Sequence, residues 1–210
     1  MIDENTQRER RNSVADAALT VMLREGIEGA GLRAIAREAD CTTGLLTHYF
    51  KDLRSVIEYA LDRNTVRFFA ALDSQLDRAR NGRDQLVAMM RYLAQAGDPV
   101  STGVMFRSLA SAQLDNRIAE RLRVAYARLH VMACEAIARG RSDGSLKGTH
   151  PVEDVADLAV ALADGIYVAG VARPANLPED RRDALILAFL STSEGPFGQP
   201  EESSAPGTQR

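Results

Sequence analysis

The stretch from Leu32 to Phe50, LRAIAREADCTTGLLTHYF, constrains the fold more than any other part of the chain. Leu32, Ile35, Ala36 and Ala39 follow the i, i+3, i+4, i+7 spacing of a single apolar helix face. This spacing predicts a short helix, and the pattern breaks directly after it.

A second short helix is predicted after the break. Thr42 can cap its first turn, because a threonine hydroxyl accepts a hydrogen bond from a backbone amide there. Leu46, Tyr49 and Phe50 share the inward face of this helix. The outward face then carries Thr43, Gly44, Leu45, Thr47 and His48. A short helix that exposes small, polar side chains can enter a DNA major groove.

The remainder of the chain predicts an all-α protein of about nine helices. Apolar residues make up 45% of the sequence and recur with helical spacing, and no run alternates long enough to indicate a strand. We expect a flexible tail over 1–6, a three-helix helix-turn-helix DNA-binding domain over 7–51, a helical effector-binding and dimerisation domain over 52–192, and a disordered tail over 193–210. Asn81-Gly82 is expected to end the fourth helix, and a polar loop is expected over 140–150.

Charge limits the class of nucleic-acid binding. The net charge is −3, which argues against a protein that coats nucleic acid without regard to sequence. Residues 7–54 hold eight basic and seven acidic side chains, a weak positive balance that still permits local phosphate contacts.

Cysteine use and hydropathy indicate the compartment. Cys41 and Cys134 are far apart and lack metal-ligand spacing, so a reducing cytoplasm is expected and a metal or cofactor is not. The most apolar run, residues 155–172, contains Asp157 and Asp164, so no membrane span is predicted.

With these motifs placed, the chain resembles the TetR/AcrR family of one-component bacterial regulators. The resemblance rests on VADAALTVMLREGIEG, then LRAIAREAD, then CTTGLLTHYFK, and it covers residues 8–60. TTGLLTHYF, with DGIYVAG at 164–170, is similar to the betaine-operon repressor subgroup. The family implies a homodimer that binds a two-fold symmetric double-stranded DNA operator and is released by a small-molecule effector.

The resemblance also implies roles for individual residues. DNA contacts are expected from Arg33, Thr42, Thr43, Gly44, Leu45, Thr47, His48, Tyr49 and Lys51. Effector-pocket candidates are Tyr92, Met105, Phe106, Tyr126, His130, Asp164 and Tyr167. Dimer-interface candidates are Ala161, Gly165, Ala169, Leu185, Ala188 and Phe189.

Each of these residues also has a simpler explanation. Arg33 can be a solvated surface side chain, and Leu45 can pack against the preceding helix instead of a thymine methyl group. The pocket candidates can be core residues, and Asp164 can be held by a structural partner. The small-residue stripe of the interface can serve packing within the chain alone.

Two other functions remain open at this point. One is a helical interaction module without DNA binding, which the weak basic charge allows. The other is a helical enzyme, although the sequence holds no nucleophile triad pattern, metal-ligand cluster or phosphate loop, and its three histidines lie in different elements.

Overall fold

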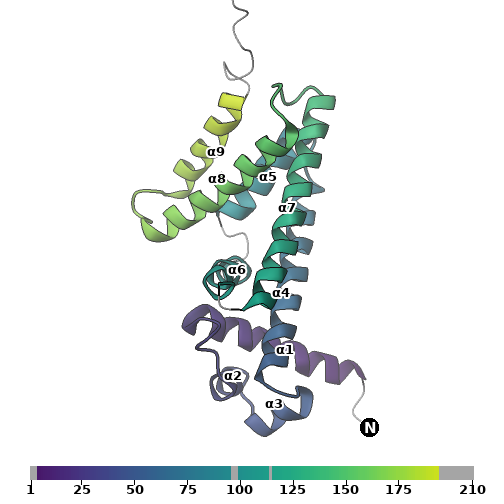
Figure 1. Cartoon of the computed structure of the whole chain (residues 1–210), viewed down its shortest axis with the longest axis vertical. Coiled ribbons are helices and arrows are strands. Elements are labelled where there is room, and N and C mark those ends of the chain that lie inside the picture. Colours follow the sequence, from purple (N-terminus) through teal and green to yellow (C-terminus); the bar gives the residue numbers. More distant parts are fainter. Residues whose placement is uncertain (1–3, 96–98, 114, 194–210) are drawn as a thin grey trace, which may run out of the picture. The chain divides into compact units, whose positions relative to one another are not determined.

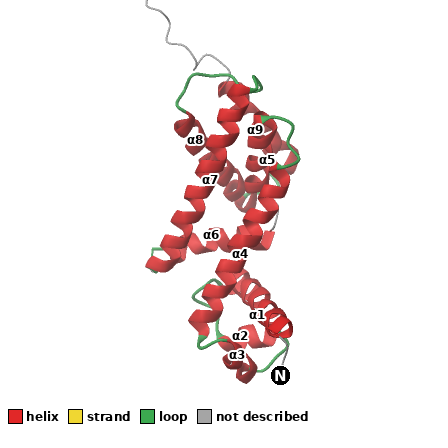
Figure 2. Cartoon of the chain, turned by 90° about the vertical axis from the view of Figure 1, so that its right-hand side faces the viewer, coloured by secondary structure: helices red, strands yellow, loops and turns green. Residues whose placement is uncertain are grey.

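The computed structural model describes residues 4–95, 99–113 and 115–193, and within these ranges the chain is helical without a strand (Figure 2). The described helices are α1 Glu4–Glu25, α2 Leu32–Glu38, α3 Thr43–Tyr49, α4 Leu53–Leu76, α5 Gly82–Ala94, α6 Pro99–Ser111, α7 Asn116–Ser142, α8 Val152–Ala172 and α9 Glu179–Ser193 (Figure 1). The all-α prediction is confirmed. Of the predicted tails, residues 1–3 and 194–210 lie outside the described residues, and α1 already begins at Glu4.

The chain forms two compact units. Among the described residues, the N-terminal unit spans 4–78, 95, 99–113 and 115–129, and therefore holds α1–α4, α6 and the first half of α7. The C-terminal unit spans 79–94 and 130–193, and holds α5, the second half of α7, α8 and α9. The segment 52–192, predicted as one effector-binding and dimerisation domain, is therefore divided between the two units.

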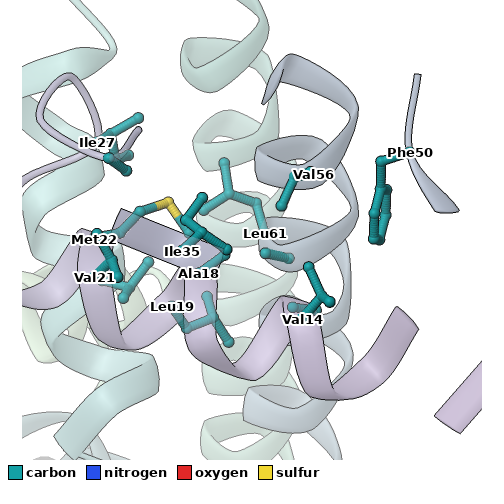
Figure 3. Close-up of a cluster of buried hydrophobic side chains, with 14 of the residues drawn as sticks. Val14, Ala18, Leu19, Val21, Met22, Ile27, Ile35, Phe50, Val56 and Leu61 are labelled. Carbon is teal, nitrogen blue, oxygen red and sulfur yellow. The ribbon is translucent and has the colours of Figure 1, made fainter. Parts of the chain in front are cut away.

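One hydrophobic cluster holds the N-terminal unit together. Figure 3 shows side chains from α1, α2 and α4 meeting in it, and Phe50 joins them directly after α3. Val104 of α6 and Ile118 of α7 belong to the same cluster. Full burial of a large aliphatic side chain stabilises a fold by about 1.5–3 kcal/mol, so this cluster is what fixes α2 and α3 on α1.

Three residues define helix ends in this unit, and Thr42 is among them, as predicted from the sequence. Gly26 follows the last residue of α1 with a φ of 83°, in the left-handed region that glycine adopts without a steric penalty. Thr42 caps α3, since its Oγ1 accepts from the Leu45 amide at 3.2 Å. Asp52 caps α4 through the Ser55 amide at 2.8 Å, and the Ser55 hydroxyl accepts from the Asp52 amide in return.

Two predicted boundaries are wrong, and local hydrogen bonds explain both. Helix α4 ends at Leu76, because Asn81 serves the next helix: its Oδ1 accepts from the Asp84 amide at 2.8 Å in the first turn of α5. Helix α7 runs past Gly140 to Ser142, and the Gly140 carbonyl accepts from the Leu146 amide at 2.8 Å as the chain turns back.

The C-terminal unit packs α5 against α8 and α9. Gly82, the first residue of α5, lies so close to the backbone of Gly140 and Ala136 in α7 that a Cβ atom there would overlap them. The Asp143 carboxylate lies at the same contact and accepts a hydrogen bond from the Gly82 amide at 2.9 Å. Hydrogen bonds from Ser145 and the Gly82 amide hold the pKa of the Asp143 carboxyl below its ordinary value.

Helix α8 is long and apolar enough to cross a membrane by the criteria of length and composition alone. Asp157 and Asp164, which argued against a span in the sequence, are both within it. One third of its most apolar window is buried inside the protein, and the core helix of a soluble protein meets the same criteria.

Candidate nucleic-acid interface and effector cavity

The outer face of α3 has the composition that the sequence predicted. Thr43, Gly44, Thr47 and His48 are exposed, as is the capping residue Thr42. Leu45 is 36% exposed, so its side chain lies at the surface and not in the core. The other predicted DNA contacts are Arg33 and Lys51, which are exposed, and Tyr49, which is half-buried.

Buried residues on the opposite face hold α3 in place. Leu46 is fully buried, and Phe50 follows it into the core cluster. The turn before α3 passes through Asp40, whose φ of 48° lies in the left-handed region. Cys41 then donates its amide to the Ala36 carbonyl at 2.9 Å, which returns the chain toward the core. Burial, followed by the charge of Asp40, raises the pKa of the Cys41 thiol, so Cys41 is a protonated, half-buried packing residue.

Two aromatic side chains, Phe50 directly after α3 and Tyr59 of α4, contact the first half of α1. The Arg11 guanidinium lies 5.0 Å from the centre of the Phe50 ring and 4.6 Å from that of Tyr59. The Tyr59 hydroxyl donates to Asn12 Oδ1 at 2.8 Å. Arg11 therefore packs within the unit, while Arg8 and Arg10 are exposed.

The ionic pairing around α3 leaves positive charge on its side of the unit. Arg24 is paired with Glu38 at 2.9 Å, and Asp16 is paired with Arg67 at 2.9 Å, so these charges are balanced. Within the described residues, the exposed cations without a salt bridge near α3 are Arg33, Arg37, Lys51 and Arg54. Asp16 is thus neutralised by cations of α4, while Asp40 and Asp52 have no salt bridge in the described part of the chain and offset part of this positive charge.

A cavity lies within the N-terminal unit, between α4, α6 and α7. The cavity itself has a volume of about 40 Å³, room for a few water molecules, so a larger ligand would have to displace lining side chains. Its lining is Leu61, Asn64, Thr65, Phe68, Phe69, Ser101, Val104, Met105, Ser108, Ile118, Arg121, Leu122 and Ala125.

Asn64 is the polar residue that distinguishes this cavity. It is 6% exposed, and its Nδ2 donates to the Ser101 carbonyl at 3.3 Å. Its Oδ1 is buried and accepts no hydrogen bond from the described residues. A buried amide oxygen without a donor is costly, so an acceptor of this kind is a natural point for ligand recognition.

The cavity shares walls with the core that positions α3. Leu61, Val104 and Ile118 line the cavity and also belong to the hydrophobic cluster around α1–α3. A molecule that displaces these three side chains therefore acts on the packing under α2 and α3, because well-packed cores do not deform without cost.

Ion pairs join α4 and α7 beside the cavity. Arg117 pairs with Glu58 at 2.7 Å, and Arg121 pairs with Asp62 at 2.8 Å. Further along, the Arg128 guanidinium lies 4.1 Å from the centre of the Phe69 ring. Arg121 is the charged residue at the rim of the cavity, and its own partner lies outside the lining.

The predicted pocket residues are divided between the two units. Met105 lines the cavity, while Phe106 and Tyr126 lie in the same unit outside the lining. Tyr92, His130, Asp164 and Tyr167 belong to the C-terminal unit.

His130 instead lies in a small polar cluster. Its Nδ1 is 2.7 Å from Asp157 Oδ1, and its Nε2 is 3.5 Å from Cys134 Sγ. Burial and the nearby carboxylates raise the pKa of the Cys134 thiol, which keeps it protonated. Within the described ranges, no group of three or more His, Cys, Asp or Glu side chains could hold a metal ion.

The sequence reasoning missed most of the cavity lining, although one signal was present. Val56, Ala60, Phe68 and Leu72 follow one face of α4 at intervals of four, and Asn64 occupies the gap in that series. A polar residue in the middle of an apolar helix face indicates a buried polar contact, which is where this cavity lies.

The predicted interface residues lie on the outer surface of the C-terminal unit. Ala161 and Gly165 are exposed on α8, and a Cβ atom at Gly165 would meet no other atom within 4 Å. Leu185 and Ala188 are exposed on α9, while Ala169 and Phe189 are half-buried.

Comparison with known proteins identifies the family of the chain. Residues 14–59 match the family model of bacterial regulatory proteins of the tetR family, and residues 82–193 match the C-terminal domain of the BetI-type transcriptional repressor. The chain is 31% identical to the HTH-type transcriptional regulator BetI of Burkholderia lata over 85% of this chain and 90% of that protein. It is 29% identical to the HTH-type transcriptional repressor KstR of Rhodococcus jostii over 78% of this chain and 72% of that protein.

Solved structures share the fold. A transcriptional regulator from Saccharomonospora viridis, solved in complex with choline, superposes with a TM-score of 0.79 at 19% identity, over 88% of this chain and 96% of the other. The order of the helices, the exposed face of α3 and these matches all indicate the same family. The chain belongs to the TetR family of helix-turn-helix transcriptional regulators, a family that is not enzymatic, and it carries a BetI-type C-terminal domain.

Proposed function

We propose that the protein is a cytoplasmic, ligand-responsive repressor that binds a two-fold symmetric DNA operator as a homodimer and is released by a small molecule. The observation that carries the proposal is the outer face of α3, where a capped helix exposes threonine, glycine and histidine beside unpaired cations. Thr43, Leu45 and Thr47 would contact base edges, while Lys51 and Arg33 would contact phosphates or guanine.

The proposed effector site is the cavity between α4, α6 and α7. Leu61, Val104 and Ile118 belong both to its lining and to the core beneath α2 and α3, which supports a mechanical link from ligand to DNA. A ligand that repacks these side chains would shift the DNA-bound arrangement of α3 and so weaken operator binding, provided that its affinities for the two arrangements differ.

The proposed dimer uses the exposed surface of α8 and α9. Leu158 is 60% and Val168 is 51% exposed, and with Ala161 and Gly165 between them they form one apolar stripe along α8. Apolar stripes of this length on a soluble protein mark interaction surfaces. A dimer would present two copies of α3 to half-sites about one helical turn, ~34–36 Å, apart or a multiple of it.

Selection from a random duplex pool tests the proposed function. We expect an enriched motif with two-fold symmetry, whose affinity for the protein falls steeply as salt rises. Absence of any enriched motif at low salt would instead support the interaction module without DNA binding.

A double variant tests the assigned contacts. Thr43→Ala with Lys51→Ala removes one proposed base contact and one phosphate contact, so operator affinity should fall by about tenfold or more at physiological salt. The matched control is Thr149→Ala with Lys147→Ala, which changes the same residue types at exposed positions after α7, away from α3. Unchanged operator binding by the first pair, measured by fluorescence anisotropy, would contradict the assignment.

A further inference from the structure

We propose that the effector of the cavity between α4, α6 and α7 is an uncharged, mainly apolar molecule whose single hydrogen-bond donor is accepted by Asn64 Oδ1. This inference rests on the proposed function, because it names the class of ligand for the proposed effector site. It concerns the chemistry of the lining and not the identity of one compound.

The walls select for apolar surface. Phe68 and Phe69 contribute two aromatic rings whose centres are 5.3 Å apart, and Leu61, Val104 and Met105 are buried around them. A ligand gains most from such a site when it buries apolar area, because that term grows with the area removed from water.

Asn64 fixes the polar part of the ligand. Its amide orientation is determined, since only Nδ2 can donate to the Ser101 carbonyl at 3.3 Å. The other atom of the amide, Oδ1, is therefore an acceptor, and it is buried without a donor from the described residues. A ligand hydroxyl or N–H group would supply the missing donor.

Two of the three hydroxyl groups of the lining already donate to backbone carbonyls. Ser108 donates to the Val104 carbonyl at 2.8 Å, and Thr65 donates to the Leu61 carbonyl at 3.0 Å. These two hydroxyl groups are therefore not free to donate to a ligand acceptor, while a ligand donor finds the unpaired oxygen of Asn64.

The charges of the lining disfavour charged ligands. Among the described residues, the lining contains no aspartate or glutamate, and Arg121 is its one charged member. A quaternary ammonium ion such as choline would meet a cation, Arg121, in the lining, and only the Phe68 and Phe69 rings would offset the loss of its hydration. An anionic ligand would have to compete with Asp62, which Arg121 contacts at 2.8 Å.

Matched ligand pairs test this class on the full chain. Isothermal calorimetry would compare 2-naphthol with naphthalene and 4-ethylphenol with ethylbenzene, with choline and 2-naphthoate as the cationic and anionic probes. We expect each hydroxylated member to bind about tenfold more tightly than its partner, and choline to give no heat at millimolar concentration.

Two variants assign the preference to one atom. Asn64→Leu should bring the affinity ratio of each pair close to one while apolar binding persists, because it removes the acceptor and keeps the branched shape of the side chain. Asn176→Leu, the same exchange at an exposed position of the C-terminal unit, should leave the ratio unchanged. An equal ratio in Asn64→Leu and the unaltered protein, tighter binding of choline or 2-naphthoate than of the phenols, or no binding of any probe would overturn the proposal.

Operator binding is measured separately in the same samples. If the protein binds its operator and the ligand preference is absent, the ligand class is wrong and the proposed function stands. If no operator is found and the Asn64-dependent preference is present, the cavity chemistry stands and the DNA-binding proposal fails.

Discussion

At the scale of single residues, the turn between α2 and α3 contains the least favourable backbone conformation of the DNA-binding helices. Asp40 is the one non-glycine residue with positive φ in the described chain, at 48°. A residue with a Cβ atom adopts this region at a cost, and aspartate tolerates it better than most because its side chain bonds locally. Asp40 also places a negative charge next to the surface that we propose to face DNA.

Replacing Asp40 with glycine should therefore stabilise the protein. We expect Asp40→Gly to raise the free energy of unfolding by about 0.5–1 kcal/mol, since glycine adopts positive φ without the steric penalty. Urea denaturation gives the value. Asp40→Asn is the control for charge: it keeps the conformational cost, so an equal gain from both variants would show that charge and not conformation is responsible.

At the scale of helices, residue pattern and capping chemistry determine most of what can be read from the sequence. The short helices α2 and α3 and the Thr42 cap were predictable, because apolar spacing and a capping hydroxyl are local properties. The ends of α4 and α7 were not, since Asn81 serves the following helix and Gly140 is buried under Leu146. The cavity was not predictable either, because its lining comes from three helices far apart in sequence and only Asn64 left a local signal.

The cap of α4 should make part of the stability dependent on pH. The Ser55 amide, followed by its hydroxyl, holds the pKa of Asp52 below its ordinary value of 3.8. A carboxyl with a lowered folded pKa contributes stability that is present above the ordinary pKa and lost as pH falls through the folded one. The stability difference between the unaltered protein and Asp52→Ala should thus be constant from about pH 5 to 7 and shrink below about pH 4.

Asp52→Asn separates titration from capping. Asparagine also caps helices but does not ionise in this range, so its stability relative to Asp52→Ala should not change with pH. Chemical denaturation at several pH values measures both differences. A gap between Asp52→Ala and the unaltered protein that stays constant down to pH 3 would show that the carboxylate is not the stabilising form.

The contact of α5 with α7 depends on the absence of a side chain at Gly82. A Cβ atom there would overlap the Gly140 amide nitrogen and the Ala136 carbonyl oxygen, both backbone atoms that cannot rotate away. Gly82→Ala should lower the free energy of unfolding by about 1–3 kcal/mol, as overpacking does. The control is Gly31→Ala, where a Cβ atom would meet nothing within 4 Å. Equal thermal stabilities of the two variants would contradict this packing.

At the scale of the whole molecule, the apolar surface of α8 is hard to reconcile with an isolated subunit. The helix has a hydropathy of 1.7 over its most apolar window, and only 33% of that window is buried within the chain. Acidic residues at Asp157 and Asp164 disfavour a lipid environment for this helix, because charged groups in hydrocarbon are costly. A second copy of the chain would cover the stripe of Leu158, Ala161, Gly165 and Val168 without that cost.

A single charge on this stripe should therefore separate the subunits. Val168→Glu would bury two carboxylates per dimer in an apolar contact, so the variant should sediment as a monomer of half the native mass at micromolar concentration. Operator affinity should fall with it, because one subunit reaches only one half-site. Val66→Glu is the matched control, since Val66 is 69% exposed on α4, away from the stripe. If Val168→Glu sediments like the unaltered protein while Val66→Glu dissociates, the interface lies on the N-terminal unit instead. A monomeric Val168→Glu variant that keeps its helical content would assign dimerisation to α8.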